Sequence, residues 1–315
     1  KLAEHALQSM AQGGMYDVVG GGFARYSTDA RWLVPHFEKM LYDNAQLARA
    51  YLYAYLLTGN PEYRRICEET LRFIQREMTL PGGGFLSAID ADSEGEEGKF
   101  YLWRDDEIDR VLPDPADNLL LRTVYHVPVQ GNFEGRVILQ RMRPLAEAAE
   151  RLGLPLDQLQ QRLDHVHGIL YRERETRIHP HRDDKVLTAW NAMMIQTLAE
   201  AGRYLNNASW LAAAQNAAEF LLANLYPQDH LLRSWRKGKA RVDGFLEDHA
   251  ALILALLELY QSDANPRWYA AARSLTETML REFHQPGQGF FDTPRGAQTL
   301  ITRPQDLQDN ATPSG

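Results

Sequence analysis

Acidic and imidazole side chains gather at Glu247-Asp248-His249, directly before the strongly apolar stretch 250–257. Two other apolar stretches begin in a similar way, one after Asp43-Asn44 and one after Trp190-Asn191. Carboxylates can act as general acid and base or bind hydroxyl groups, an imidazole can transfer protons, and an aromatic face can stack on a sugar ring. This set predicts a carbohydrate site in which the candidate catalytic residues are Glu247, Asp248, His249 and Asp43, and the candidate substrate-binding residues are Trp190, Asn191 and Asn44.

The three starts belong to a repeated unit. Asn60, Asn207 and Asn265 lie 16 residues after Asn44, Asn191 and His249, respectively, and an aromatic residue follows each of them three positions later. In two copies a glycine-aromatic loop comes 25 residues after the asparagine, at Phe85 and Phe290. One unit is therefore a helix, an asparagine-capped turn, a second helix and a glycine-aromatic loop. A period of 58 residues, from Asn191 to His249, suits a large helical hairpin.

Apolar periodicity and capping residues predict where the helices lie. The longer ones are expected over residues 37–57, 61–78, 155–174, 187–205, 209–225, 246–260 and 266–283. A β-hairpin is expected from residues 85–89 and 99–103. The predicted fold is all-α, with small β-hairpins in the loops. It is an (α/α)6 toroid of helical hairpins that forms one domain over residues 1–315 and is incomplete in this chain, because its last hairpins are missing.

The first helix of each unit is the more apolar one, which predicts that it lies on the inside of the ring. The starts of these helices then surround the mouth of the ring, where the helix dipoles add partial positive charge. Loops that reach the same mouth add His36 as a candidate catalytic residue, and Asp90, Asp92 and Asp184 as candidate substrate-binding residues.

Each of these residues also has a purely structural interpretation. Asp43, Asn44, Asn191 and Asp248 suit helix caps, Trp190 suits core packing, and His249 suits a buried histidine whose hydrogen bonds are made inside the protein. The acidic loop that begins at Asp90 is also consistent with a solvated turn. It resembles a calcium loop, but Tyr101 stands where such a loop has glutamate. No metal and no cofactor are expected.

Composition excludes several classes of function. The chain has 315 residues, is 44% hydrophobic and has a net charge of −8, and no run of lysine and arginine stands out, so nucleic acid is not an expected partner. The best apolar run, 250–257, is too short to span a membrane. The single cysteine, Cys67, allows no internal disulfide, which fits a cytoplasmic setting.

Several stretches also resemble a known family. They are Gly20-Gly-Gly-Phe-Ala-Arg-Tyr-Ser27, Trp32-Leu-Val-Pro-His-Phe-Glu-Lys-Met-Leu-Tyr-Asp43, Asp90-Ala-Asp-Ser-Glu-Gly95 with Phe100-Tyr-Leu-Trp103, Gly131-Asn-Phe-Glu-Gly135, Asp183-Asp-Lys-Val-Leu-Thr-Ala-Trp-Asn191 and Phe245-Leu-Glu-Asp-His249. They resemble the YyaL family, which comprises thioredoxin-domain-containing proteins similar to spermatogenesis-associated protein 20. The resemblance implies a six-hairpin glycosidase-like toroid preceded by a thioredoxin-like domain, which would be a partner within the full-length protein.

The expected toroid also resembles the fold of N-acylglucosamine 2-epimerase and cellobiose 2-epimerase. Those enzymes carry a His-x-x-Glu motif at the matching inner helix. Here Glu247 matches the glutamate, but Gly244 stands at the histidine position and His249 follows two residues after the glutamate.

Two hypotheses of function follow. The first is a carbohydrate-active enzyme that acts on a small-molecule sugar in an acidic funnel at the ring mouth. It would be either epimerase- or isomerase-like, with His249 or His36 as the base, or glycosidase-like, with a pair of carboxylates. The second is a non-catalytic module that binds a sugar or a peptide and is fused to the thioredoxin-like redox domain.

Overall fold

The chain divides into two units, each made of two separate segments. Unit 1 comprises Lys1–Met40 and Ile89–Arg182, and unit 2 comprises Leu41–Ala88 and Asp183–Gly315. The structure is a computed structural model and describes residues 1–296 and 302–313. The single domain expected over residues 1–315 stays a prediction.

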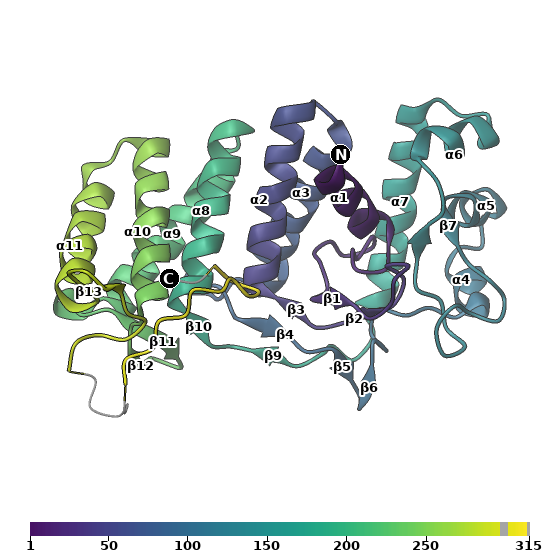
Figure 1. Cartoon of the computed structure of the whole chain (residues 1–315). Helices are drawn as coiled ribbons and strands as arrows, with labels where there is room; N and C mark the ends of the chain where they lie inside the picture. Colours follow the sequence, from purple (N-terminus) through teal and green to yellow (C-terminus); the bar gives the residue numbers. More distant parts are fainter. Residues whose placement is uncertain (297–301, 314–315) are drawn as a thin grey trace. The chain divides into compact units, whose positions relative to one another are not determined.

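In its described part, unit 2 contains the three helical hairpins that the repeat predicts. They are α2 (Leu41–Thr58) with α3 (Pro61–Phe73), α8 (Thr188–Tyr204) with α9 (Ala208–Leu225), and α10 (Leu246–Asp263) with α11 (Pro266–Glu282). A π-helical turn, Ile74–Met78, extends α3. Helices α2, α8 and α10 lie side by side with α8 in the middle (Figure 1). These bounds confirm the predicted helices, except that α2 begins at Leu41 because the residues before it are extended.

The second helix of each hairpin begins for the same physical reason. The side chains of Asn60, Asn207 and Asn265 accept hydrogen bonds from backbone N–H groups in the first turn of α3, α9 and α11. Each cap therefore satisfies donors that have no partner within the helix. The aromatic residue three positions later, Tyr63, Trp210 or Trp268, is at most 3% exposed. The repeated Asn-x-x-aromatic pattern thus fixes where each hairpin turns and what its second helix buries.

Short strands lie next to the helices of unit 2. Strands β10 (Val186–Leu187), β11 (Leu232–Arg236) and β12 (Lys239–Asp243) form an antiparallel sheet in that order. Strands β13 (His284–Gln285) and β14 (Gly289–Phe290) form a hairpin. A 3-10 turn, Pro227–Asp229, follows α9. The β11–β12 hairpin was not among the expected elements.

Unit 1 is built on a longer helix and several short ones. The helices are α1 (Leu2–Gln12), α4 (Asp105–Val111), α5 (Pro115–Val124), α6 (Leu145–Leu152) and α7 (Leu156–Arg174). Strand pairs are β1 (Tyr26–Ser27) with β2 (Pro35–His36), β5 (Asp92–Ser93) with β6 (Glu96–Glu97), and β7 (Tyr125–His126) with β8 (Gln140–Arg141). The chain crosses between the units after β3 (Lys39–Met40) and within β4 (Ala88–Ile89) and β9 (Arg182–Asp183). Of residues 99–103, expected as a strand, residues 99–101 form turns instead, and Trp103 makes an isolated antiparallel bridge with Val137.

The core of unit 1 packs α5, α6 and α7 against Trp103 and neighbouring apolar residues. Leu120, Leu163, Val166 and Leu170 are each at most 2% exposed. The spacing of Leu163, Val166 and Leu170 puts them on one face of α7, as the apolar periodicity of residues 155–174 predicts, and Leu120 comes from α5. Over the whole described chain, no helix is both long and apolar enough to cross a membrane.

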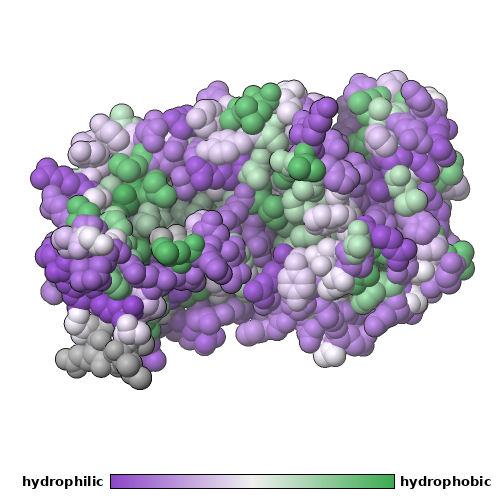
Figure 2. Space-filling view, in the orientation of Figure 1, coloured by the Kyte–Doolittle hydropathy of each residue, from purple (hydrophilic) through white to green (hydrophobic). Residues whose placement is uncertain are grey.

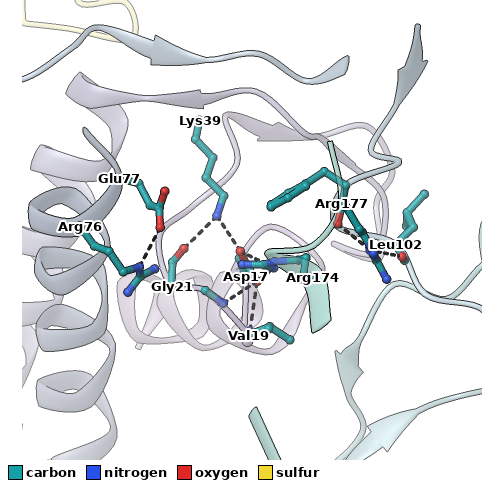
Figure 3. Close-up of polar contacts among 11 residues, drawn as sticks. Asp17, Val19, Gly21, Lys39, Arg76, Glu77, Leu102, Arg174 and Arg177 are labelled. Atoms are coloured by element: carbon teal, nitrogen blue, oxygen red, sulfur yellow. Dashed lines mark hydrogen bonds and ion pairs between the residues drawn. The ribbon is translucent and has the colours of Figure 1, made fainter. Parts of the chain in front are cut away.

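A buried ion cluster fixes the N-terminal loop of unit 1 to the end of α7. Asp17 accepts hydrogen bonds from Lys39 Nζ at 2.8 Å and from Arg174 Nη1 at 2.8 Å (Figure 3). The side chains of Lys39 and Arg174 are only 3% and 4% exposed. Gly20 has no room for a side chain, because a Cβ there would lie 2.0 Å from Arg174 Nη2. Burial alone would raise the pKa of Asp17, but the two cations outweigh it and hold that pKa far below its usual range.

A second polar network joins the inner helices of unit 2 at equivalent positions of the repeat. Tyr53, Glu200 and Glu258 each lie nine residues after Asn44, Asn191 and His249. Glu200 accepts hydrogen bonds from Tyr53 at 2.9 Å and from Arg49 at 2.7 and 2.8 Å. Glu258 pairs with Arg203. Burial and the nearby charge of Glu200 raise the pKa of Glu258 above its ordinary value.

We expect Asp17→Asn to lower the free energy of unfolding at pH 7 by about 3–5 kcal/mol, because it leaves two buried cations without their carboxylate. The folded pKa of Asp17 is depressed, so its contribution is present above the unfolded value of 3.8 and is lost as the pH falls below it. Urea unfolding at pH 7 and at about pH 2.5, below the unfolded value, measures both effects. Asp106→Asn, at a surface ion pair, is the control and should change little. Equal stability of Asp17→Asn and the parent would contradict the assignment.

We expect Glu258→Gln to flatten the dependence of stability on pH above the unfolded value of 4.5. The folded pKa of Glu258 is raised, so its contribution to stability is greatest below the unfolded value of 4.5 and is lost as the pH rises through the folded pKa. Glu277→Gln, which removes an exposed ion pair on α11, is the matched control. If the free energy of unfolding measured in urea depends on pH in the same way for both variants, Glu258 and Glu200 are not coupled as described.

Candidate functional site

The start of α10 is held by a buried carboxylate. Asp248 is 1% exposed and accepts hydrogen bonds from the backbone N–H of Phe245 at 2.9 Å and of Ala189 at 3.1 Å. The first bond caps α10, and the second ties it to the first turn of α8. Asp248 is therefore a structural anchor whose oxygens also face Arg233.

Arg233, which lies on β11, bridges the two acidic residues at this helix start. Its Nη1 lies 2.6 Å from Glu247 Oε1 and 2.9 Å from Asp248 Oδ2. Burial raises the pKa of Asp248 to about 6, against the opposing charge of Arg233. Burial would lower the pKa of Arg233, but the two carboxylates raise it. Near pH 7 the group is therefore one guanidinium between two carboxylates.

The prediction overlooked Arg233 because it overlooked the β11–β12 hairpin. A usable signal was present: residues 231–236 and 239–243 flank Lys237-Gly238, and both residues of this two-residue turn have positive φ, 48° and 78°. Such turns connect antiparallel strands and favour glycine at the second position.

His249 faces the interior of unit 2. It is 4% exposed, its ring centroid lies 4.9 Å from that of Phe283, and its Nδ1 lies 3.0 Å from the carbonyl oxygen of Phe245. Because a carbonyl can only accept, Nδ1 carries the proton. Burial lowers the pKa of His249, so the ring is neutral near pH 7. These contacts are those of a packed histidine.

The residues at the other two helix starts are also largely enclosed. Asn191 is fully buried: its Oδ1 accepts from the N–H of Phe85 at 2.8 Å, and its Nδ2 donates to the carbonyls of Phe85 and Leu187 at 3.0 Å. It thereby clamps the glycine-aromatic loop onto α8. Asn44 is fully buried as well, and Asp43 is half-buried in the first turn of α2. Trp190 packs edge-on against Tyr42, with ring centroids 4.7 Å apart.

The remaining predicted residues form surface contacts. In unit 2, Asp184 pairs with Arg236. In unit 1, His36 Nδ1 lies 2.8 Å from Glu97 Oε1, and its ring stacks on Tyr26. Asp90 and Asp92 are exposed, and Asp90 Oδ1 accepts from the N–H of Asp92. The structure groups eight predicted residues in unit 2 and three, His36, Asp90 and Asp92, in unit 1.

Two pockets of unit 2 meet at the start of α10. The larger, about 430 Å³, is mostly apolar, and Figure 2 shows an apolar hollow over α8 and α10 in the left half of the view. Its lining includes Ala45, Met193, Ala251, Leu254, Met279 and Phe290. The smaller, about 220 Å³, is polar and includes Asp292, Asp306, Gln308 and Asn310. Leu246, Glu247 and Pro313 line both.

Of the predicted residues in the described part of unit 2, Glu247 alone lines these pockets. Its carboxylate stands between an apolar cavity and two further carboxylates, those of Asp292 and Asp306. Sequence reasoning missed both aspartates, because they lie in a segment without helical periodicity. Among the described residues, no group of three or more His, Cys, Asp and Glu side chains is placed to hold a metal ion. The acidic groups that line the two pockets are the carboxylates of Glu247, Asp292 and Asp306.

Comparison with known proteins identifies relatives of the chain by sequence. No family model matches it. It is 35% identical to human spermatogenesis-associated protein 20 and 34% identical to the mouse protein, in each case over 100% of this chain and 44% of the relative. The chain thus spans less than half the length of these relatives.

Solved structures match the fold. Unsaturated glucuronyl hydrolase from Bacillus sp. GL1 aligns over 93% of this chain and 60% of its own, with a TM-score of 0.53 and 15% identity. A family 76 glycoside hydrolase from Bacteroides thetaiotaomicron aligns over 94% and 46%, with a TM-score of 0.53 and 14% identity. The predicted resemblance and fold class are confirmed: over its whole length the chain is homologous to spermatogenesis-associated protein 20, and its fold is that of the six-hairpin glycosidase-like (α/α)6 toroid enzymes.

Proposed function

We propose that the protein is a carbohydrate-active enzyme of the glycoside-hydrolase type, and that Glu247 is its central catalytic carboxylate. The observation that carries the proposal is the place of Glu247, where an apolar pocket and a carboxylate-lined pocket meet. The two fold neighbours are named for hydrolysis of glycans, and this supports the substrate class at the level of the fold alone.

The roles follow from charge. Glu247 is paired with Arg233, which holds the carboxylate in place, and a carboxylate can accept a proton from water or attack the sugar carbon. The leaving oxygen then takes a proton from a second carboxyl group, for which Asp292 and Asp306 of the smaller pocket are the candidates. The apolar pocket accommodates the less polar side of the ligand.

Epimerase-like chemistry is the weaker interpretation, because it needs a base beside the substrate carbonyl. The imidazole of His249 is buried against Phe283, and its Nδ1–H is bound to the Phe245 carbonyl. We therefore assign Glu247 rather than His249 the central role. The alternative of a non-catalytic binding module remains as one outcome of the first test below.

We expect the purified protein to hydrolyse at least one member of a panel of aryl glycosides and uronic acid disaccharides, and Glu247→Gln to lower that rate at least ~100-fold with little change in stability. Glu277→Gln, an exposed carboxylate on α11, is the control and should keep full activity. Thermal shifts are measured in parallel, since a ligand at 100 times its Kd adds about 2.7 kcal/mol. If a sugar stabilises the protein but is not hydrolysed, the non-catalytic binding module replaces the enzyme as the proposed function. If no sugar stabilises the protein and none is hydrolysed, both hypotheses are contradicted.

We also expect the activity to fall as the pH drops through about 6. Burial raises the pKa of Asp248 to about 6, and above this value its carboxylate holds Arg233 beside Glu247. Protonation below pH 6 removes that charge, and the pair of Arg233 and Glu247 loses its support. Asp248→Asn should have a lower rate, and its pH–rate profile should lack the step near pH 6. If the step persists in Asp248→Asn, another group produces it.

A further inference from the structure

A second cleft lies in unit 1, outside the site proposed above. It has a volume of about 450 Å³ and is formed by the β5–β6 hairpin and the turns after it, by α4, by the loop that ends at Arg136, and by residues 176–178 after α7. One of the stretches that resemble the YyaL family, Asp90–Gly95 with Phe100–Trp103, contributes to its lining, and another, Gly131–Gly135, ends directly before the lining residue Arg136. The proposed hydrolase chemistry of unit 2 uses neither stretch.

Positive charge dominates the lining of this cleft. It contains five basic side chains, Lys99, Arg104, Arg110, Arg136 and Arg177, and two acidic ones, Glu94 and Glu107. Three other carboxylates, Glu96, Asp106 and Glu173, pair with these cations, but in the described chain they are not part of the lining. The cations therefore face the cleft, and some of their partners lie outside it.

The exposed arginines keep donors for a ligand. Among the described residues, Arg110 makes one side-chain hydrogen bond, to Glu173 at 2.8 Å, and Arg136 makes one, to Glu96 at 2.9 Å. A guanidinium has five N–H donors, and its planar fork matches phosphate oxygens. Both arginines are partly exposed, 63% and 30%, and so are their partners, so the existing ion pairs are weak and compete poorly with a more highly charged ligand.

Arg177 forms the rigid floor of the cleft. Its guanidinium lies 4.1 Å from the ring centroid of Trp103, and its Nη1 donates to the carbonyls of Phe100 and Leu102 at 2.6 and 2.8 Å (Figure 3). Its Nη2 donates to Glu107 at 2.9 Å. Burial, together with the charge of Arg174, lowers the pKa of Arg177, so this cation lacks full compensation. A positioned, poorly compensated guanidinium below exposed arginines is the pattern expected of an anion site.

We propose that this cleft binds the phosphate group of a small molecule, with Arg110 and Arg136 as mobile donors above Arg177. A phosphate carries nearly two negative charges and three acceptor oxygens near neutral pH, which suits several convergent arginines. The same group is present in free phosphate and in a phosphate ester, and the ligand series below distinguishes these two sources. The proposal does not depend on the function assigned to unit 2.

The test is calorimetric titration of the purified protein with inorganic phosphate, with glucose 6-phosphate and with glucuronate, each at the same ionic strength set with sodium chloride. We expect phosphate to bind and glucuronate to bind more weakly. Tighter binding of glucose 6-phosphate than of inorganic phosphate identifies an ester site, and the reverse identifies a site for the free ion. Binding of none of the three, or preference for the carboxylate, overturns the proposal.

Variants locate the binding. Arg110→Ala and Arg136→Ala should each weaken phosphate binding about 10-fold or more, because each removes one cation and its donors from the cleft. Arg151→Ala is the matched control, since Arg151 is an exposed arginine of unit 1 that pairs with Glu147 on α6 and lies outside the cleft lining. The three variants change surface residues, and their melting temperatures verify that they are folded. Equal weakening in all three would mean non-specific attraction to positive charge and would contradict a site at this cleft.

Discussion

The buried carboxylate of Asp17 holds together parts of unit 1 that are far apart in sequence. It meets Lys39, which lies on β3, and Arg174, which is the last residue of α7. Two cations without this carboxylate would have to be desolvated alone, which costs more than most packing defects. The cluster also positions its surroundings: Lys39 lies over the ring of Tyr101, and Arg174 lies over Phe100 and Tyr101. Phe100, and Arg177 three residues after Arg174, both line the arginine-rich cleft, so the ion cluster sets the geometry of that cleft.

In unit 2, three helices begin at equivalent positions of the repeat. Polar residues at these starts bind backbone groups of neighbouring segments rather than solvent. Asn191 holds the glycine-aromatic loop at Phe85, and Asp248 holds the first turn of α8 at Ala189. Glu247 differs from both, because its side chain is 31% exposed and points to the pockets while Arg233 fixes it. Because the neighbouring polar residues bind backbone groups, Glu247 is the residue of this helix start whose carboxylate can act on a ligand in the pockets.

The sequence predicted what local physics decides. Asparagine caps and apolar periodicity located the hairpins of unit 2 to within a few residues. Pairings between distant residues were beyond reach: no spacing rule links Asp17 to Arg174, or Arg233 to Glu247 and Asp248. The sequence also did not predict how deeply each polar side chain is buried. His249, Asn191 and Asp248 have residue types suited to catalysis, and only their enclosure by Phe283, Phe85 and Phe245 reveals that their polar atoms are engaged inside the protein.

Residues in the family-like stretches can be explained by the fold alone. Lys39, Asn191 and Asp248 each lie in a stretch that resembles the YyaL family, and each is buried and bonded in a way that explains its residue type through the fold. A motif maintained by the fold tells little about the reaction. Residues that the fold does not need, because their side chains reach a pocket and keep exposed charge, are the better guides to function. Glu247 in unit 2 and Arg110 and Arg136 in unit 1 meet this criterion, and for that reason the proposals rest on them. Glu247 lies in the same family-like stretch as Asp248, so the two neighbours are distinguished by the exposure of their side chains and not by the motif.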